Sequence, residues 1–232
     1  MKRIIFLSML LATTIMQAKA ETLNDSTVIN FKNEVPALPS NVAKISGGLS
    51  CIYSKVQTPT QIHRGLFGFD FMLDYEHLWK KGMGFGINYV RNYTKCEGQG
   101  ITFNYVGASF VQSRMTKSGF RLETAYGLGY VHKHEDYPAG YIVYNGGYGS
   151  YNSSYYDYTQ LMDEEYQYSQ DGLGLMAKFG VEYAILPHCA IGVEANWLLH
   201  FFKSQNVSWV KEENKGNDFA RFNIAAGFRF YF

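Results

Sequence analysis

Residues 65–77 read GLFGFDFMLDYEH, and this stretch decides the fold. The odd positions from 67 to 75 carry aromatic or aliphatic side chains, while the even positions from 68 to 76 carry glycine, methionine or an acid. Successive side chains of a β-strand point to opposite faces. The alternation therefore predicts a strand with one apolar, aromatic face and one small or charged face.

The same alternation recurs along the chain and predicts eight strands of about 10–14 residues each. These strands are 44–54, 65–77, 83–93, 101–112, 120–131, 172–183, 189–199 and 219–232. Within 101–112 the pattern changes phase, because Ile101, Phe103 and Tyr105 share one face and Val106, Ala108 and Phe110 share the other. An extra residue in a strand re-aims the side chains that follow it, so Gly107 is predicted to mark a β-bulge.

The composition excludes several classes of protein. The chain has 232 residues, of which 47% are hydrophobic and 18% charged, so it is not a disordered chain. Its net charge of +1 provides no basic field for nucleic acid. A helical membrane protein needs runs of roughly 18 or more apolar residues, and the chain after residue 20 contains none.

The first 20 residues, MKRIIFLSMLLATTIMQAKA, predict a secretory signal peptide. Lys2 and Arg3 precede a short apolar stretch, and Ala18-Lys19-Ala20 forms a small-x-small cleavage site. The alternative is a membrane anchor, which is disfavoured because the apolar stretch is too short to span comfortably. Residues 21–43 are polar with two prolines and are expected to form a periplasmic leader or linker, followed by a barrel domain at 44–232.

The strand pattern is compatible with a soluble β-sandwich, with a lipocalin-like barrel or with a membrane barrel. The polar faces are dominated by glycine, alanine, asparagine and charges of both signs, which suits a crowded interior better than a solvated surface. The strands are long enough to cross a bilayer at a tilt of about 45°. The prediction is an all-β fold, an eight-stranded antiparallel up-and-down transmembrane β-barrel.

The connections between the predicted strands differ in length. Residues 79–82, 113–118 and 184–188 are short connections, whereas 55–63, 94–100, 133–169 and 200–217 are mostly longer. Membrane barrels have short periplasmic turns and longer external loops. Both ends of the predicted barrel are therefore expected on the periplasmic side.

Ten charged residues fall on the predicted inner face of the strands. They are Asp70, Asp74, Glu76, Arg121, Glu123, Lys178, Glu182, Glu194, Arg221 and Arg229. An eight-stranded barrel is just wide enough for side chains to fill it, and buried charges persist when they are paired. An interior salt-bridge network is favoured, with a narrow, passive or gated pore through the same network as the alternative.

The end of the chain carries the most specific signal. Residues 225–232 read AAGFRFYF, in which a glycine precedes alternating aromatics and a terminal phenylalanine. This tail resembles the C-terminal insertion signal of bacterial outer-membrane barrels at Gly227, Phe230 and Phe232. Over 44–232 the plan resembles the small OmpA-like and OmpX-like barrels. The resemblance implies a bacterial outer-membrane location, lipid as surroundings and the barrel-assembly machinery as a partner, and it implies fold more than activity.

The segment 133–169 is the most unusual connection. With residue 170 it holds ten of the 19 tyrosines, at 137, 141, 144, 148, 151, 155, 156, 158, 166 and 168. Tyrosine, serine, glycine and asparagine are the residues that recognition loops favour. The segment is a flexible loop or extended hairpin, or else a surface that binds an extracellular protein or glycan. The candidate contact residues are Tyr141, Tyr144, Tyr148, Tyr151, Tyr155, Tyr156 and Tyr158.

Catalysis and metal binding find little support in the sequence. A lipid-modifying enzyme would need a serine activated by a histidine and an acid, and no such set is compact on one predicted strand face. His132 and His134 are interpreted as part of a charged strand end rather than as metal ligands. No reaction, cofactor or metal is expected. The three cysteines are interpreted as mostly apolar filler, with a Cys51–Cys96 disulfide as the alternative.

Overall fold

The computed structural model describes residues 38–54, 56–57, 62–63, 65–79, 82–137, 139, 142–147, 156–161, 165–202 and 219–232. The chain divides into two units, Met1–Val35 and Pro36–Phe232. The predicted signal peptide, most of the predicted leader and four of the candidate tyrosines (Tyr141, Tyr148, Tyr151 and Tyr155) lie outside the described residues. None of the described residues forms a helix long and apolar enough to cross a membrane.

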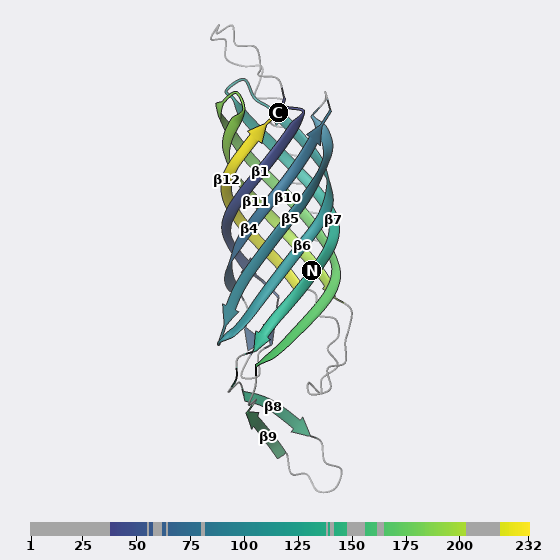
Figure 1. The fold of residues 1–232 in the computed structure, drawn as a ribbon, viewed down its shortest axis with the longest axis vertical. Coiled ribbons are helices and arrows are strands. Elements are labelled where there is room, and N and C mark those ends of the chain that lie inside the picture. Colours follow the sequence, from purple (N-terminus) through teal and green to yellow (C-terminus); the bar gives the residue numbers. More distant parts are fainter. Residues whose placement is uncertain are drawn as a thin grey trace. The chain divides into compact units, whose positions relative to one another are not determined.

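Eight antiparallel strands close into a barrel in which neighbouring strands follow one another along the chain, as Figure 1 shows. They are β1 (Asn41–Ile52), β4 (Leu66–Leu78), β5 (Met83–Cys96), β6 (Gln99–Met115), β7 (Phe120–Tyr137), β10 (Tyr166–Leu186), β11 (Cys189–Phe202) and β12 (Phe219–Tyr231). The barrel closes where β12 pairs with β1. The predicted eight-stranded up-and-down fold is confirmed, although β1 begins three residues before the predicted start at residue 44.

Four shorter strands form two hairpins. Strand β2 (Val56–Gln57) pairs with β3 (Ile62–His63), and β8 (Ile142–Gly147) pairs with β9 (Tyr156–Leu161). The long strands β7 and β10 stay paired as far as Tyr137 and Tyr166. Residues 133–137 and 166–169, which the sequence assigned to a loop, therefore belong to the two strands.

The connection between β5 and β6 is a two-residue turn, so the prediction of a longer loop at 94–100 was wrong. Strand β5 continues to Cys96, β6 starts at Gln99, and only Glu97 and Gly98 lie between them. Both turn residues have positive φ, 47° and 90°. A two-residue turn of this kind matches the right-handed twist of paired strands, which is why no longer loop is needed here.

The two faces of the barrel wall differ as the alternation predicted. On β4, for example, Phe67, Phe69 and Phe71 are exposed outside, whereas Asp70 and Asp74 are buried inside. The other strands also expose large apolar side chains on the outer face, among them Ile87, Val106, Leu128, Leu173, Val193 and Phe228. Soluble monomers rarely expose contiguous apolar surface of this kind, while a lipid bilayer matches it. The barrel is therefore a transmembrane barrel.

Strand β6 passes Gly107 without a bulge, so that prediction was wrong. Its register with β5 and β7 is continuous through Gly107. Phe103 and Tyr105 are apolar residues that point inward and are buried. A Cβ at Gly107 would lie 2.2 Å from the Tyr105 hydroxyl, so the glycine makes room for this ring inside the barrel. The register shift that the described ladders do contain lies between β10 and β11, at Ala184 and Leu186.

Candidate functional site

An apolar cluster fills the lumen at the end of the barrel that carries the short turns. This turn-end cluster consists of Val42, Leu78, Val111, Ala125, Ala190 and Tyr231, all of them buried. Its members come from six strands, β1, β4, β6, β7, β11 and β12. The first residue of β1 and Phe232 also meet at this end, where the backbone N–H of Asn41 donates to the Phe232 carbonyl over 2.9 Å.

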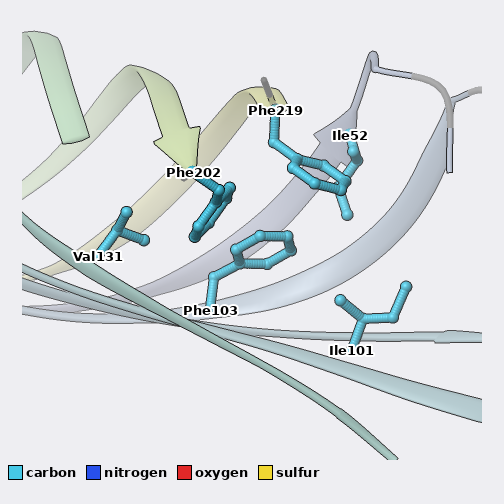
Figure 2. Close-up of a cluster of buried hydrophobic side chains, with 6 residues drawn as sticks. All are labelled: Ile52, Ile101, Phe103, Val131, Phe202 and Phe219. Atoms are coloured by element: carbon cyan, nitrogen blue, oxygen red, sulfur yellow. The ribbon is translucent and has the colours of Figure 1, made fainter. Parts of the chain in front are cut away.

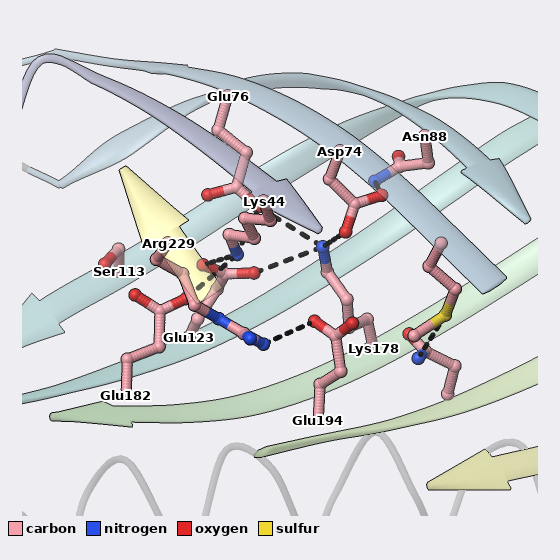
Figure 3. Close-up of polar contacts among 12 residues, drawn as sticks. Lys44, Asp74, Glu76, Asn88, Ser113, Glu123, Lys178, Glu182, Glu194 and Arg229 are labelled. Carbon is pink, nitrogen blue, oxygen red and sulfur yellow. Dashed lines mark hydrogen bonds and ion pairs between the residues drawn. The ribbon is translucent and has the colours of Figure 1, made fainter. Parts of the chain in front are cut away.

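A charge network lies next to the turn-end cluster, and Figure 3 shows part of its contacts. We call it the lower network; it consists of Lys44, Asp74, Glu76, Arg121, Glu123, Lys178, Glu182, Glu194 and Arg229. The Lys44 ammonium contacts Glu76 at 2.7 Å, Glu123 at 2.5 Å and Glu182 at 3.2 Å. One ammonium thus holds carboxylates from three strands together.

The other three bases of the lower network share the same carboxylates. The Arg121 guanidinium contacts Glu76, Glu123 and Glu182 at 2.8 Å each and also donates to Ser113. The Lys178 ammonium contacts Asp74 at 2.9 Å, Glu76 at 3.2 Å and Glu123 at 3.3 Å. Arg229 contacts Glu182 and Glu194 at 3.3 and 3.2 Å. Each base has at least two acidic partners, which buried charges require.

All ten charged residues assigned to the inner face from the sequence are buried in the structure, and eight of them belong to the lower network. Asp70 and Arg221 lie apart from it. The sequence assignment missed Lys44, which contacts three of the predicted acids. The signal was present, because Lys44 directly precedes the outward-facing Ile45 at the start of the predicted strand.

A third layer lies between the lower network and the end of the lumen opposite the short turns, which we call the external end. The middle cluster consists of Met72, Val90, Tyr105, Met176, Leu198 and Ala225. Asp70 lies beside this cluster and accepts hydrogen bonds from the side-chain amides of Asn92, at 2.6 Å, and Asn223. Both carboxylate oxygens of Asp70 are therefore occupied by neutral donors.

Arg221 and His200 differ from the charged groups of the lower network. Both side chains are buried, yet none of their nitrogens has a hydrogen-bond partner among the described residues. The nearest acid to Arg221 is Asp70, at 3.7 Å, which is too long for a hydrogen bond. Both residues instead face the Phe103 ring, Arg221 at 5.7 Å and His200 at 5.2 Å from its centroid.

The outer aromatic cluster fills the external end of the lumen, as Figure 2 shows. It consists of Ile52, Ile101, Phe103, Val131, Phe202 and Phe219. The Lys133 ammonium lies 5.0 Å from the centroid of Phe219 and 5.5 Å from that of Phe202, and it pairs with Glu135 at 3.0 Å. Apolar clusters thus lie toward both ends of the lumen, with the lower network between them and the Lys133–Glu135 pair beside the outer one.

The outer face of β7 and β10 turns polar near the external end. Tyr130 and Leu173 form the last exposed apolar pair, and His132 and Asp171 form the next outward-facing pair. The His132 ring nitrogen lies 2.7 Å from the Asp171 carboxylate, which also accepts from the Tyr130 hydroxyl. From His132 to Tyr137 the ladder continues for about 17 Å at ~3.4 Å per residue. It therefore extends past the lipid-facing band.

A serine, a histidine and an acid come together on this polar part of the ladder. His134 Nδ1 lies 2.8 Å from the Ser169 hydroxyl, and His134 Nε2 lies 3.0 Å from the Asp136 carboxylate. Sequence reasoning missed this set because Ser169 is on β10 and the other two are on β7. Among the described residues, no group of three or more histidines, cysteines and acids is arranged to hold a metal ion.

The cysteines and the chain end have simple surroundings. Cys51, Cys96 and Cys189 are free thiols. Cys51 shares the outward face of β1 with Leu49, while Cys96 is buried on β5, so the alternative of a disulfide between them was wrong. At the seam between β12 and β1, a Cβ on Gly227 would lie 2.0 Å from the Ile45 carbonyl oxygen. Phe230 and Phe232 are exposed on the outer face.

Comparison with known proteins agrees with the fold. No model of a known protein family matches the chain, and neither does any curated protein. The structure is similar to that of Neisserial surface protein A, with a TM-score of 0.56, 14% identity and coverage of 83% of this chain and 97% of that one. Ail of Yersinia pestis is also similar, with 14% identity, a TM-score of 0.45 and coverage of 82% of this chain and 99% of that one. The outer membrane protein OprG of Pseudomonas aeruginosa has 14% identity, a TM-score of 0.47 and coverage of 86% of this chain and 99% of that one. The NspA match and the strand topology confirm the resemblance to small eight-stranded barrels at the level of the fold.

Proposed function

We propose that this protein is a bacterial outer-membrane barrel that acts as a surface-interaction protein through the tyrosine-rich segment between β7 and β10. In this proposal residues 1–20 direct secretion, and the chain from residue 21 to the start of β1 at Asn41 is a periplasmic leader. The barrel-assembly machinery inserts the barrel through the tail that holds Gly227, Phe230 and Phe232. The ligand is an extracellular protein or glycan.

The filled lumen is the observation that carries this proposal. Side chains occupy it from the turn-end cluster, through the lower network and the middle cluster, to the outer aromatic cluster. The paired charges of the lower network lie between two apolar clusters, and this interior favours a plugged lumen over an open path for ions or solutes. A barrel with this interior acts through its surface, and the longest connection supplies the largest surface.

The position of the tyrosine-rich segment supports the same proposal. Strands β7 and β10 carry it on a paired ladder that continues beyond the apolar band, and β8 and β9 pair within it. Tyrosine combines a large contact area with a low entropy cost, and neighbouring serine, glycine and asparagine adapt their hydrogen bonds. A rigid ladder would hold such a segment clear of the membrane.

Deletion of residues 139–165 tests the proposal on intact cells. We expect the deletion to abolish binding of the cells to immobilised extracellular-matrix proteins or to a glycan array, because the candidate contact tyrosines are removed. Replacing residues 55–63, which hold β2 and β3, with a short glycine-serine linker provides the matched control and should leave binding unchanged. Heat-modifiable migration on a detergent gel verifies that both variants form barrels. Undiminished binding by the 139–165 deletion would contradict the proposal.

The alternative of a narrow pore has a separate test. Because apolar clusters lie at both ends of the lumen, we expect purified protein in planar bilayers to show no steady conductance. A sustained conductance in the nanosiemens range, carried by the folded barrel alone, would establish the pore instead.

A further inference from the structure

The set formed by Ser169, His134 and Asp136 has the components of a nucleophile, a base and an orienting acid. The serine hydroxyl lies 2.8 Å from His134 Nδ1, and the Asp136 carboxylate lies 3.0 Å from Nε2 of the same ring. Hydrogen-bond distances of about 2.6–3.2 Å between these groups are the geometric requirement for an activated serine. Two neighbouring strands hold the set, since His134 and Ser169 are directly paired residues of β7 and β10.

The two contacts suit the neutral tautomer of the ring that carries its hydrogen on Nε2. When Asp136 accepts the hydrogen of Nε2, the neutral imidazole keeps its lone pair on Nδ1. That lone pair faces the Ser169 hydroxyl and can take its proton. An acid on one ring nitrogen and a hydroxyl on the other is the arrangement that serine hydrolases of unrelated folds share, and it is recognised by geometry rather than by chain order.

The set is open to the outside of the barrel and lies at the membrane boundary. The side chains of His134 and Asp136 are 31% and 49% exposed, and Ser169 is exposed as well. On the same outward face, Tyr130 and Leu173 belong to the apolar band, and the His132–Asp171 pair separates them from His134 and Ser169. Polar headgroups and the ester bonds of lipids lie at the edge of the hydrocarbon, next to such a band.

Two cations lie on the same outward face, on β5. Arg91 and Lys95 are both exposed. Tyr93, the outward-facing residue between them, pairs with Thr102, and Thr102 pairs with His134. With strands about 4.8 Å apart and residues about 3.4 Å apart along a strand, the backbone of the two bases lies about 12 Å from His134 and about 16 Å from Ser169. Long arginine and lysine side chains can cover part of that span, so a lipid phosphate held from β5 and an acyl ester at β10 can belong to one lipid.

We propose that Ser169, His134 and Asp136 form an esterase site for acyl esters of phosphorylated lipids in the surrounding membrane, a function beyond the surface interaction. Ser169 Oγ attacks the ester carbonyl carbon while its proton moves to His134 Nδ1. The bond to the lipid alcohol breaks, and His134 returns the proton to the departing oxygen. Water then cleaves the acyl-serine by the same route and releases a fatty acid. Asp136 is a positioning residue that holds the ring.

The test uses the full barrel, refolded in detergent, with two substrates and one covalent probe. Mixed micelles of diacyl phosphatidylglycerol report lipid hydrolysis through released fatty acid, and p-nitrophenyl butyrate reports general esterase activity. A fluorophosphonate marks an activated serine, which mass spectrometry locates. We expect release of fatty acid from phosphatidylglycerol and labelling of Ser169.

Single substitutions separate the roles. S169A is expected to lower lipid hydrolysis by about 10³-fold or more and to abolish labelling. D136N is expected to lower kcat by roughly 10²–10⁴-fold with little change in KM, because it disturbs the ring and not the binding of lipid. K95M is expected to raise KM alone. S118A is the matched control, an exposed serine beside the turn between β6 and β7, and should leave both readouts unchanged.

Three outcomes would overturn the proposal. The first is wild-type barrel, folded by heat-modifiable migration, that neither hydrolyses phosphatidylglycerol nor reacts with the fluorophosphonate. The second is S169A protein that retains full lipid hydrolysis. The third is hydrolysis of p-nitrophenyl butyrate without hydrolysis of the lipid, which removes the substrate class. Mass spectrometry of the wild-type protein alone shows whether Ser169 is labelled, so a variant that fails to fold does not block the test.

Discussion

The two halves of the lumen treat buried charge in opposite ways. In the lower network four bases meet five carboxylates, and Arg121 alone contacts three of them at 2.8 Å. Toward the external end, Arg221 is equally buried, but its nearest acid is 3.7 Å away and an aromatic ring covers it. Arginine therefore holds strands together in one half, and in the other half its desolvation is offset only by one distant acid.

This difference follows from the side chains that surround each arginine. Near Arg121 the inward positions of three other strands are Lys44, Glu76 and Glu182, so ionised partners are within reach. Near Arg221 the inward positions are mostly apolar, and Asp70 is already saturated by asparagine amides. Removing one partner of closely paired buried charges costs much stability, whereas replacing a buried cation that has no hydrogen bond and only a distant acid costs little.

Replacing each arginine by methionine tests most directly whether the two contribute differently to stability. R121M is expected to destabilise the barrel by about 3–5 kcal/mol, because it leaves three buried carboxylates short of a partner. R221M is expected to change stability by about 1 kcal/mol or less, because the lost charge was not hydrogen-bonded. Urea unfolding in lipid vesicles, followed by tryptophan fluorescence, measures both values.

The double variant D70N/R221M provides the control for this experiment. It removes both charges of the Arg221–Asp70 pair, and the carboxamide at position 70 keeps one neutral oxygen that can accept from Asn92 or Asn223. We expect it to be as stable as the wild type. If R121M and R221M lowered the free energy of unfolding equally, the two halves would not differ in the way the arginine–carboxylate distances indicate.

The sequence predicted the walls of the barrel better than its interior. The alternation in 65–77 identified the outward Phe67 and the inward Asp70 correctly, because side-chain direction in a strand depends only on local geometry. The phase change in 101–112 was misinterpreted as a bulge. That inference assumed a polar lumen throughout, whereas the external half also contains apolar clusters and takes Phe103 and Tyr105 inward.

Contacts between strands could not be predicted from the sequence in the same way. The inward charges could be assigned because each lies on one face of its own strand. The pairing of His134 with Ser169 depends on the register between β7 and β10, which are separated by the longest connection. This register is fixed only when all eight strands pair in the closed barrel, so it cannot be predicted from any single stretch of sequence.

Two interior glycines test the packing difference between the halves. A Cβ at Gly129 would lie 2.3 Å from the Val106 carbonyl oxygen and 2.8 Å from the Tyr105 ring, whereas a Cβ at Gly180 would lie 3.8 Å from Glu123 and 3.9 Å from Glu194. G129A is therefore expected to destabilise the barrel by about 1–3 kcal/mol through overpacking. G180A is its matched control and should change stability by about 0.5 kcal/mol or less. A tolerated G129A would mean that the backbone beside Tyr105 can shift.

The smallest effect is expected where an acid contacts its partners on the rim instead of in the lumen. Asp171 accepts from Tyr130 and contacts His132 at 2.7 Å, but its side chain is 66% exposed. Because exposed pairs contribute little, D171N should leave the free energy of unfolding unchanged within experimental error.

High salt distinguishes the rim contact from the lower network. Any loss of stability that D171N shows at low ionic strength should vanish in roughly 1 M salt, where screening acts over about 3 Å. The loss in R121M should persist there, because its partners are shielded from solvent ions. A salt-resistant loss in D171N would place the rim contact in the same class as the lower network.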